Sequence, residues 1–227
     1  MRRRGIFITL EGIDGTGKST QFRLLVRYLR RRGYRVCATR EPGGTKVGEK
    51  VRSILLASRT GKLAPLAELA LIYAARAQHL EEVVRPALAR GEVVVSDRFN
   101  DASFAYQGYG RRLGVAIVQA FDRVICGRTQ PDLTLVFDLE SRAALARAHG
   151  RERRRNSRHG RFEAQGYSFH QRVRRGYLEI AWRDATRVRI VDASHPVKDI
   201  QAKVRDLVDL FLAREKFQGG RRSRTSG

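Results

Sequence analysis

A glycine-rich segment at residues 12–19 has the residue types of a phosphate cradle. It reads Gly-Ile-Asp-Gly-Thr-Gly-Lys-Ser and fits the pattern GxxxxGK[ST]. In this pattern backbone N–H groups curl around phosphate oxygens, the lysine reaches the β- and γ-phosphates, and the last hydroxyl binds Mg²⁺. An ordinary glycine turn is the alternative. We predict a site for a nucleoside triphosphate formed by Gly12, Asp14, Gly15, Thr16, Gly17, Lys18, Ser19 and Thr20.

Charged residues also follow two apolar runs that are predicted to be strands. Asp97 and Arg98 come directly after the run Val93-Val94-Val95-Ser96, and Arg40 follows the run at 35–39. An aspartate at the carboxyl end of a strand beside a phosphate loop can hold Mg²⁺, although it can also simply cap a helix. We predict Ser19 and Asp97 as the metal residues. The fork of the Arg40 guanidinium suits a phosphate monoester.

An arginine-rich run at residues 150–161 contains no apolar residue to pack, and we expect a mobile loop there. Phosphoryl transfer requires charge stabilisation, and the variable positions of the phosphate loop carry no basic residue. We predict that the run acts as a lid that supplies at least one arginine to the triphosphate, although most of its arginines are solvated charges. The catalytic candidates are Lys18, Asp97, Arg98, Arg153, Arg154 and Arg158.

Short apolar runs alternate with longer helical patterns, which indicates a parallel sheet covered by helices on both faces. We predict strands at 6–11, 35–39, 93–96, 133–138 and 188–191. The predicted helices are 18–32, 46–58, 64–89, 113–126, 141–148, 165–185 and 197–215, and Pro86 is expected to kink or end the third. The predicted fold is α/β, of the three-layer P-loop NTPase type, with a five-stranded parallel sheet flanked by helices.

The length of 227 residues and the even composition favour one domain, which we assign to residues 1–218, including the lid. Residues 219–227 are expected to be a disordered basic tail. No apolar run approaches the ~20 residues of a membrane span. The basic start imitates a signal peptide, but Glu11 ends the apolar stretch early, and we expect no export.

The chain has 46 basic and 23 acidic residues, a net charge of +23. Such a balance can indicate nucleic-acid binding. However, many arginines fall on predicted solvent faces of helices, so general arginine enrichment is the simpler interpretation and nucleic acid is not an expected partner. Cys37 and Cys126 belong to no metal-binding cluster and are expected to be thiols in a reducing cytoplasm.

Several separate motifs, in order, together resemble thymidylate kinase over nearly the whole chain. They lie at residues 11–20, 39–44, 73–76, 96–98, 105–108, 131–134, 161–163, 172–174 and 191–193. The resemblance is to the bacterial type, in which a closing lid supplies the arginine that other members carry in the phosphate loop. It implies transfer of the ATP γ-phosphoryl group to dTMP with Mg²⁺, in dTTP biosynthesis, by a cytoplasmic homodimer without a membrane partner.

The same resemblance implies roles for individual residues. Arg40 and Arg98 would hold the dTMP phosphate, and Asp14 would approach the sugar 3′-hydroxyl. Arg76 and Gln107 would hydrogen-bond the thymine edge. The remaining implied contacts are Tyr106 at the sugar 2′ position, Glu41, Pro42, Ile72 and Ser103 in the dTMP site, and Asp192 and Ala193 bordering adenine.

Two positions depart from the family pattern. Ile72 stands where a phenylalanine usually stacks on thymine, and Gly160 stands where the lid usually carries an aspartate. Loss of base–aromatic stacking implies weaker or relaxed selection of thymine. Two alternatives therefore stay open: a kinase for another nucleoside monophosphate, and a non-catalytic paralogue that binds nucleic acid through its positive charge.

Overall fold

The computed structural model describes residues 5–57, 63–155, 162 and 165–222. Five strands form one parallel sheet in the order β2-β3-β1-β4-β5. The strands are β1 (Ile6–Glu11), β2 (Val36–Arg40), β3 (Val93–Asp97), β4 (Leu133–Asp138) and β5 (Val188–Asp192). The prediction of a five-stranded parallel sheet is confirmed, and the bounds of β1 and β4 agree with the predicted ones.

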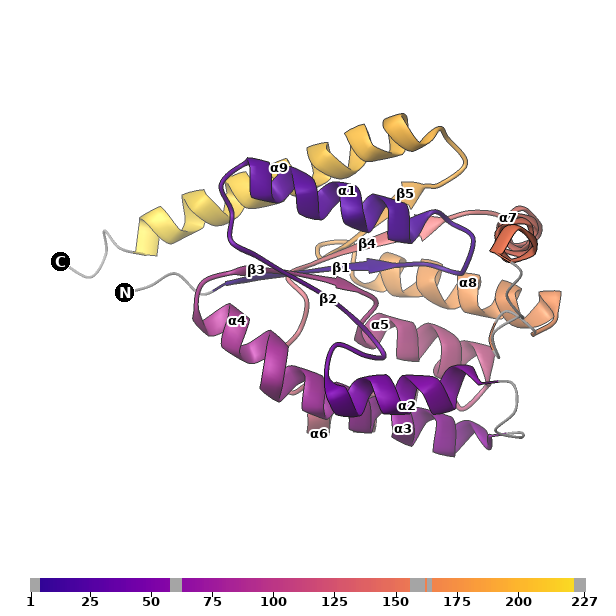
Figure 1. Ribbon diagram of the computed structural model, residues 1–227. Coiled ribbons are helices and arrows are strands. Elements are labelled where there is room, and N and C mark those ends of the chain that lie inside the picture. Colours follow the sequence, from indigo (N-terminus) through magenta and orange to yellow (C-terminus); the bar gives the residue numbers. More distant parts are fainter. Residues whose placement is uncertain (1–4, 58–62, 156–161, 163–164, 223–227) are drawn as a thin grey trace.

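Helices cover both faces of the sheet (Figure 1). One layer consists of α1 (Lys18–Arg31) and α9 (Val197–Arg222). The other face is covered by α3 (Pro65–His79), the π-helical η1 (Leu80–Val84), α4 (Arg85–Ala89) and α8 (Tyr167–Arg183). Farther out on this side lie α2 (Lys46–Leu56) and α6 (Val115–Ile125), while the mostly buried α5 (Asn100–Ser103) and the π-helical η2 (Phe104–Gly110) pack against α8.

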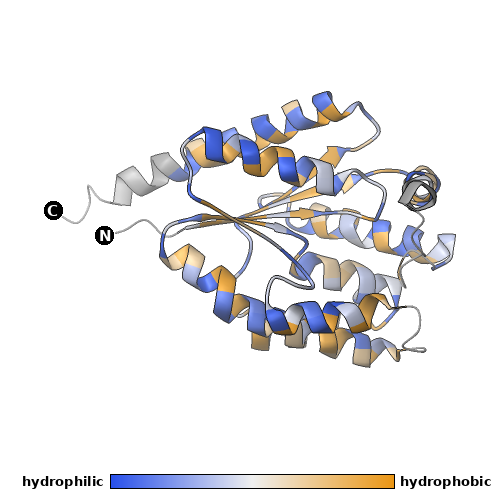
Figure 2. Ribbon diagram, viewed as in Figure 1, coloured by the Kyte–Doolittle hydropathy of each residue, from blue (hydrophilic) through white to orange (hydrophobic). Residues whose placement is uncertain are grey.

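The apolar faces of the helices meet the sheet, as the hydropathy colouring shows (Figure 2). Along β1 successive side chains enter different clusters, because neighbouring residues of a strand point to opposite faces. Phe7 packs toward α3 and α4, whereas Ile8 packs with Leu25 and Leu29 of α1, and all four are fully buried. Each such side chain contributes roughly 1.5–3 kcal/mol through burial of apolar surface. The central strands β1, β3 and β4 are thus buried on both faces, as predicted, whereas the edge strands β2 and β5 are only partly buried.

Pro86 does not end the third predicted helix. The helical run continues from Pro65 to Ala89, with π-helical geometry over Leu80–Val84 just before the proline. Proline lacks the N–H that an α-helix needs at this point, and the wider turn accommodates the lost hydrogen bond. The run Asn100–Gly110 is also helical, although its sequence, rich in glycine and aromatic residues, predicts no helix.

Two arginine-rich segments are more helical than predicted. Helix α7 (Ser141–Arg155) continues through residues 150–155, which were expected to form a loop, and α9 continues to Arg222, inside the expected tail. Both predictions were wrong. Over residues 151–155 the reason is that arginine and glutamate favour helices even without apolar partners, whereas the continuation of α9 through Gly219 and Gly220 has no such explanation in helix propensity. Residues 156–161 and 223–227 lie outside the described residues. No helix among the described residues has the length and apolar character that crossing a bilayer requires.

The order of the strands determines where a site can form. The strand β1 lies between β3 and β4, so the chain reverses direction across the sheet at this point. In open α/β sheets ligands bind outside the carboxyl ends of the strands at such a switch point. These ends face α7, while the start of β1 lies at the opposite end of the sheet (Figure 1).

Candidate active site

The predicted phosphate loop joins β1 to α1. Gly12, Gly15 and Gly17 have φ angles of 136°, 88° and 80°, which disfavour residues with a Cβ. A Cβ on Gly12 would also lie 2.5 Å from the carbonyl oxygen of Phe137, and one on Gly15 would overlap the carbonyl of Ala144 in α7. The glycines therefore allow the curled backbone and let α7 pack directly on the loop.

Lys18 and Ser19, the first residues of α1, face Asp97 at the end of β3. Lys18 Nζ lies 3.3 Å from Asp97 Oδ1, and the Ser19 hydroxyl donates a hydrogen bond of 3.3 Å to Asp97 Oδ2. Burial raises the pKa of Asp97, but the charges of Lys18 and Arg98 outweigh this effect and lower the pKa overall. Asp97 therefore stays ionised beside the phosphate loop.

The hydroxyl of Ser19 and the carboxylate of Asp97 are hard oxygen ligands and fit Mg²⁺. Among the described residues no group of three or more His, Cys, Asp or Glu side chains could hold a metal ion. Mg²⁺ usually keeps several waters and is held by one or two carboxylates together with substrate phosphates. A site of two protein oxygens next to a phosphate loop suits that mode of binding.

Arg98 has an unusual backbone conformation, with a φ of 75°. Such a left-handed conformation costs energy in a residue with a side chain and persists where neighbours fix it. The Arg98 N–H donates to the Leu10 carbonyl at 3.0 Å, and the Ser96 hydroxyl donates to the Arg98 carbonyl at 2.7 Å. The following N–H, of Phe99, donates to Glu11 Oε1 at 2.7 Å. These contacts turn the Arg98 side chain toward the phosphate loop.

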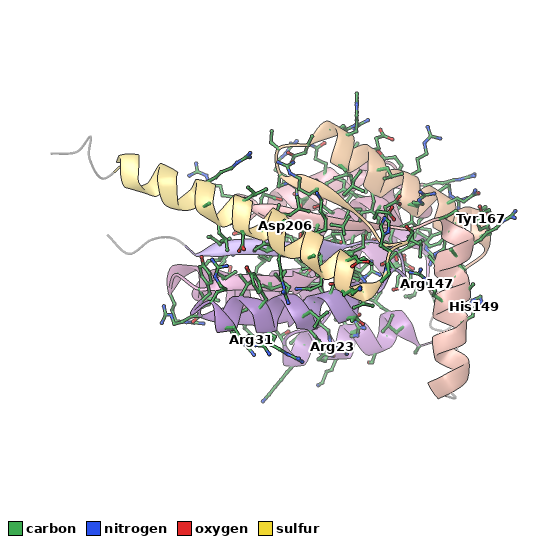
Figure 3. All side chains as sticks on the ribbon, turned by 90° about the horizontal axis from the view of Figure 1, so that it is seen from above. Arg23, Arg31, Arg147, His149, Tyr167 and Asp206 are labelled. Carbon is green, nitrogen blue, oxygen red and sulfur yellow. The ribbon has the colours of Figure 1, made fainter. Side chains whose placement is uncertain are left out.

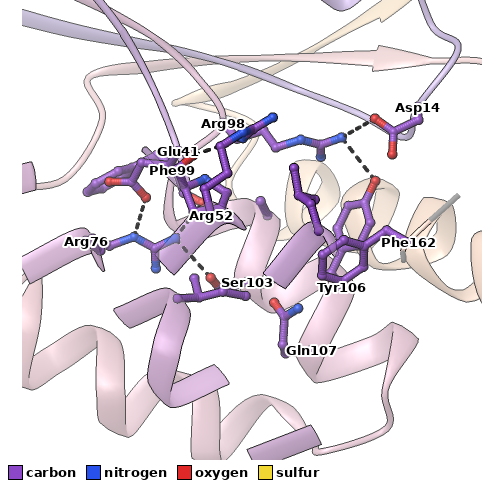
Figure 4. A pocket seen from close by; sticks show the side chains of 14 residues that line it. Asp14, Glu41, Arg52, Arg76, Arg98, Phe99, Ser103, Tyr106, Gln107 and Phe162 are labelled. Atoms are coloured by element: carbon purple, nitrogen blue, oxygen red, sulfur yellow. Dashed lines mark hydrogen bonds and ion pairs between the residues drawn. The ribbon is translucent and has the colours of Figure 1, made fainter. Parts of the chain in front are cut away.

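The guanidinium of Arg98 connects the phosphate loop to a pocket. Its Nη2 donates to Asp14 Oδ1 at 2.8 Å and to the Tyr106 hydroxyl at 3.1 Å (Figure 4). Its Nη1 donates to the Tyr177 hydroxyl at 3.2 Å. Burial raises the pKa of Asp14, but the nearby Arg98 and Lys18 charges lower it overall. Arg98 and Lys18 thus lie on the same side of the molecule, within reach of a single carboxylate.

Glu11, at the end of β1, holds in place the backbone turn that follows Arg98 and the Tyr177 side chain that contacts Arg98. Its Oε1 accepts the hydrogen bond from Phe99 N, and its Oε2 accepts one of 2.8 Å from the Tyr177 hydroxyl. Burial, reinforced by the charge of Asp101, raises the pKa of Glu11 to about 8. Glu11 therefore holds the turn that carries Arg98 and titrates near neutral pH.

A pocket opens beside Arg98 (Figure 4). The structure brings nine of the ten predicted substrate residues into its wall: Asp14, Glu41, Pro42, Ile72, Arg76, Arg98, Ser103, Tyr106 and Gln107. The other lining residues are Arg52, Leu56, Phe99, Ala102 and Phe162. Ala102, Ser103, Tyr106 and Gln107 come from the helical run over α5 and η2, and π-helical geometry is frequent at functional sites.

The structure does not bring Arg40 into the pocket wall. Its Nη2 contacts both carboxylate oxygens of Glu49, at 3.0 and 2.9 Å, and its side chain is 54% exposed. Arg52, which the sequence analysis missed, lines the pocket instead and donates to the Pro42 carbonyl at 2.9 Å. Burial and the charge of Arg40 lower the pKa of Arg52. The one available signal was its place on the helix after the Gly43-Gly44 turn, four residues before Leu56, so that Arg52 and Leu56 share a helix face; both line the pocket.

Arg76 is the most deeply buried charge of the pocket. Its Nε contacts Glu41 Oε2 at 2.6 Å, and its guanidinium carbon lies 4.4 Å from the centroid of the Tyr73 ring and 5.1 Å from that of the Phe99 ring. Its Nη2 donates to the Ser103 hydroxyl, whereas Nη1 is buried without a hydrogen-bond partner. An unsatisfied buried donor is costly, so a pocket ligand with an acceptor atom would stabilise this group.

At the other end of the site, α7 approaches the segment that follows β5. Arg147 Nη1 donates to the Ala193 carbonyl at 2.8 Å, and Asp192 accepts from the Ser194 N–H at 2.9 Å. Figure 3 shows Arg147 at the end of the molecule that α7 occupies. Of the predicted catalytic arginines, Arg153 and Arg154 lie in the last turns of α7. Arg158 lies outside the described residues.

Comparisons with known proteins agree on one family. The family model for thymidylate kinase matches residues 10–204. A thymidylate kinase of Desulfovibrio desulfuricans is 46% identical over 211 residues, covering 92% of this chain and 97% of the relative. One of Pseudomonas syringae pv. syringae is 49% identical over 208 residues, with the same coverage of both chains.

A solved structure of thymidylate kinase from Ehrlichia chaffeensis superimposes with a TM-score of 0.73 at 30% identity. The match covers 91% of this chain and 99% of the other. The parallel sheet, the phosphate loop at its switch point and the arginine-lined pocket occur in a chain that aligns with these relatives over almost its full length. The chain belongs to the thymidylate kinase family.

Proposed function

We propose that this protein transfers the γ-phosphoryl group of ATP to dTMP, with dTMP bound in the pocket beside Arg98 and ATP bound at the phosphate loop. The observation that carries the proposal is the position of Arg98, which lines the pocket while its guanidinium contacts Asp14 of the phosphate loop at 2.8 Å. A phosphate monoester held by Arg98 would therefore lie next to the triphosphate.

The pocket supports a thymine base in its inner part. The unpartnered Nη1 of Arg76 offers a hydrogen bond to a carbonyl oxygen such as thymine O4. Gln107 and Ile72 contribute further wall surface, and Tyr106 borders the path toward Arg98. Arg52 and Arg98 are the other two arginines that line the pocket, and together they can neutralise a phosphate dianion.

Phosphoryl transfer requires the protein to position the two phosphates and to stabilise the negative charge of the transferring group. An oxygen of the dTMP phosphate attacks the γ-phosphorus of ATP while the bond from that phosphorus to the β-phosphate oxygen breaks, giving dTDP and ADP. The attacking phosphate is already an anion at neutral pH, so no general base is required. Lys18 stabilises the negative charge of the transferring group, and one or more of Arg153, Arg154 and Arg158 add to it when ATP is bound.

Bound Mg²⁺ would neutralise phosphate charge, and Ser19 and Asp97 are the residues that would hold it. Asp192 and Ala193 would border the adenine, near the end of α7 that packs on the phosphate loop. We place the reaction in the cytoplasm, where ATP is supplied and where thiols such as Cys37 and Cys126, both unpaired here, stay reduced.

We also propose that the protein is a homodimer whose interface lies on the outer side of α2, α3 and α6. These helices lie together on one side of the sheet (Figure 1). They carry exposed apolar side chains. The residues are Val47, Ile54, Leu66, Ile117 and Val124. Size-exclusion chromatography with light scattering should give a dimer that Val124→Lys shifts toward monomer. Leu210→Lys, on the opposite layer, is the matched control and should leave the dimer intact.

A substrate panel tests the proposed function directly. ADP release is measured with dTMP, dUMP, dGMP, UMP and dCMP as acceptors and with Mg²⁺ and ATP held constant. We expect the highest kcat/KM for dTMP. A higher value for another acceptor would replace dTMP as the substrate, and no turnover with any acceptor would overturn the assignment of the protein as an active kinase.

A further inference from the structure

Glu68, on α3, lies behind the pocket wall and is not itself a pocket residue. Its side chain is 1% exposed. Glu68 Oε1 accepts hydrogen bonds from Gln107 Nε2 at 2.9 Å and from Arg111 Nε at 3.0 Å, and Glu68 Oε2 accepts one from Arg111 Nη2 at 2.9 Å. A carboxylate paired in this way with a guanidinium only accepts hydrogen bonds.

This contact determines which end of the Gln107 amide faces the pocket. An amide has a donor end and an acceptor end, and the orientation is assigned from the surrounding hydrogen bonds. Because Glu68 binds the Nε2 end, the carbonyl oxygen Oε1 is left for a ligand in the pocket that Gln107 lines. The flipped amide would place two acceptor oxygens against each other in a buried position, which is costly.

We propose that Glu68 is a specificity-determining positioning residue, which fixes the Gln107 amide with its carbonyl toward the base and thereby selects pyrimidines that carry an N3–H. The inference rests on the proposed function, since it requires the base to lie between Arg76 and Gln107. Figure 4 shows these two side chains on the wall of the same pocket.

The two groups then present a fixed pattern to the base. Arg76 Nη1 is a donor without a partner, and Gln107 Oε1 is an acceptor. Thymine and uracil offer the complementary pair, the O4 acceptor and the N3–H donor. Cytosine has both reversed, with an amino donor at position 4 and an acceptor at N3. Guanine matches the pattern through O6 and N1–H, so size rather than hydrogen bonding must exclude it.

The hydrogen-bond partners of Glu68 hold its carboxylate, and with it the Gln107 amide, in a fixed orientation. Arg111 binds Glu68 through two of its nitrogens and donates through Nη1 to Gln165 Oε1 at 2.8 Å. Its guanidinium also lies 4.8 Å from the centroid of the Phe169 ring on α8. Glu68 is therefore anchored to elements on the far side of the pocket wall, and it cannot follow Gln107 if the amide turns.

The test compares two substitutions of Glu68 by the ratio of kcat/KM for dTMP to that for dCMP. Glu68→Gln keeps the shape but gives the position a donor, so Gln107 can turn its amide nitrogen toward the base. We expect the ratio to fall about tenfold or more, since cytosine N3 then finds a donor. Glu68→Asp keeps an acceptor-only carboxylate, and its ratio should stay within about threefold of the original protein.

The ratio is insensitive to loss of folded protein, because both substrates are measured on one preparation. Melting temperatures of both variants are recorded in parallel. A purely structural role predicts that the shorter Asp side chain harms the protein at least as much as Gln, with an unchanged ratio in both. That result, or an equal loss of the ratio in both variants, would overturn the proposal.

The original protein separates this inference from the proposed function. It should strongly prefer dTMP to dCMP and should lose activity toward dTMP methylated at N3, which lacks the donor. If it does, a constant ratio in Glu68→Gln would reject the role of Glu68 alone. If the original protein accepts dCMP or the N3-methylated substrate as well as dTMP, the placement of the base fails and the role of Glu68 fails with it.

Discussion

The two halves of the site are built in different ways. The donor half, at residues 12–19, is one continuous segment, whose function depends on backbone N–H groups and on the conformation of its glycines. The acceptor half takes its arginines from separate elements: Arg52 from α2, Arg76 from α3 and Arg98 from the residue after β3. The comparison shows that a backbone site can be found from a short motif, whereas a side-chain site depends on how the fold brings distant residues together.

The difference predicts how each half fails when one residue changes. Removal of the donor-side cation in Lys18→Ala should give the largest effect, a loss in kcat on the order of 10³-fold, because Lys18 stabilises charge that develops during transfer. The far-ultraviolet circular dichroism spectrum and the Kd for dTMP should stay close to those of the original protein. A kcat within threefold of the original value would show that the donor half does not use Lys18.

The acceptor half can be tested with two arginines that differ only in where the fold places them. Arg52→Met should raise KM for dTMP about 10- to 100-fold, because a charge-assisted contact with the phosphate is lost. Arg40→Met should change KM less than threefold, since Arg40 is paired with Glu49 outside the pocket wall. An equal rise in KM in both variants would restore Arg40 as a phosphate residue, and no rise in either would remove Arg52 from the phosphate site.

Glu11 links the two halves through the turn that carries Arg98, and its protonation should affect stability. The pKa of Glu11 is raised from 4.5 to about 8, so the folded protein binds its proton more tightly than the unfolded chain does. The stabilisation is fully present below about pH 4.5 and declines as pH rises toward 8, by on the order of 1 kcal/mol per pH unit. In denaturant titrations, the difference in free energy of unfolding between the original protein and Glu11→Gln should fall over this range. A constant difference would mean that Glu11 is ionised throughout.

The smallest expected effect concerns the base. Ile72 lies in the pocket wall with 8% of its surface exposed, and Ile72→Phe would add an aromatic face for stacking. We expect KM for dTMP to fall about three- to tenfold, somewhat less than the full energy of stacking on a base allows. An unchanged or raised KM would indicate that the base does not lie against residue 72.

The elements of the fold were largely predictable. The three central strands are short apolar runs whose two faces are both buried. The stripe formed by Ile200, Val204 and Val208 on α9 is also buried in the core, as its spacing predicts. The helix boundaries were predicted wrongly where burial of apolar side chains does not determine the backbone conformation. Helix α7 extends through an arginine run because helix propensity suffices, and π-helical geometry at Leu80–Val84 carries the chain past Pro86.

Site residues that belong to a recognisable sequence motif could be predicted, and those outside any motif could not. Asp97 and Arg98 could be found because they end a strand, and the resemblance to the family pointed to Arg76 and Gln107. Arg52 carries no motif, and Arg40 was assigned to the phosphate because the sequence cannot show that Glu49 pairs with it. Nor can a sequence show the contact between Glu68 and Gln107, which are 39 residues apart.

The central claim is that the donor half and the acceptor half hold the ATP γ-phosphate and the dTMP phosphate close enough for direct transfer. A compound that joins adenosine to thymidine through a chain of phosphates tests it most directly, with affinity measured by isothermal titration calorimetry. We predict binding at least about 100-fold tighter than that of dTMP alone, because one ligand would occupy both halves. Both Lys18→Ala and Arg98→Met should weaken it. Binding no tighter than that of dTMP would show that the halves are not aligned for transfer.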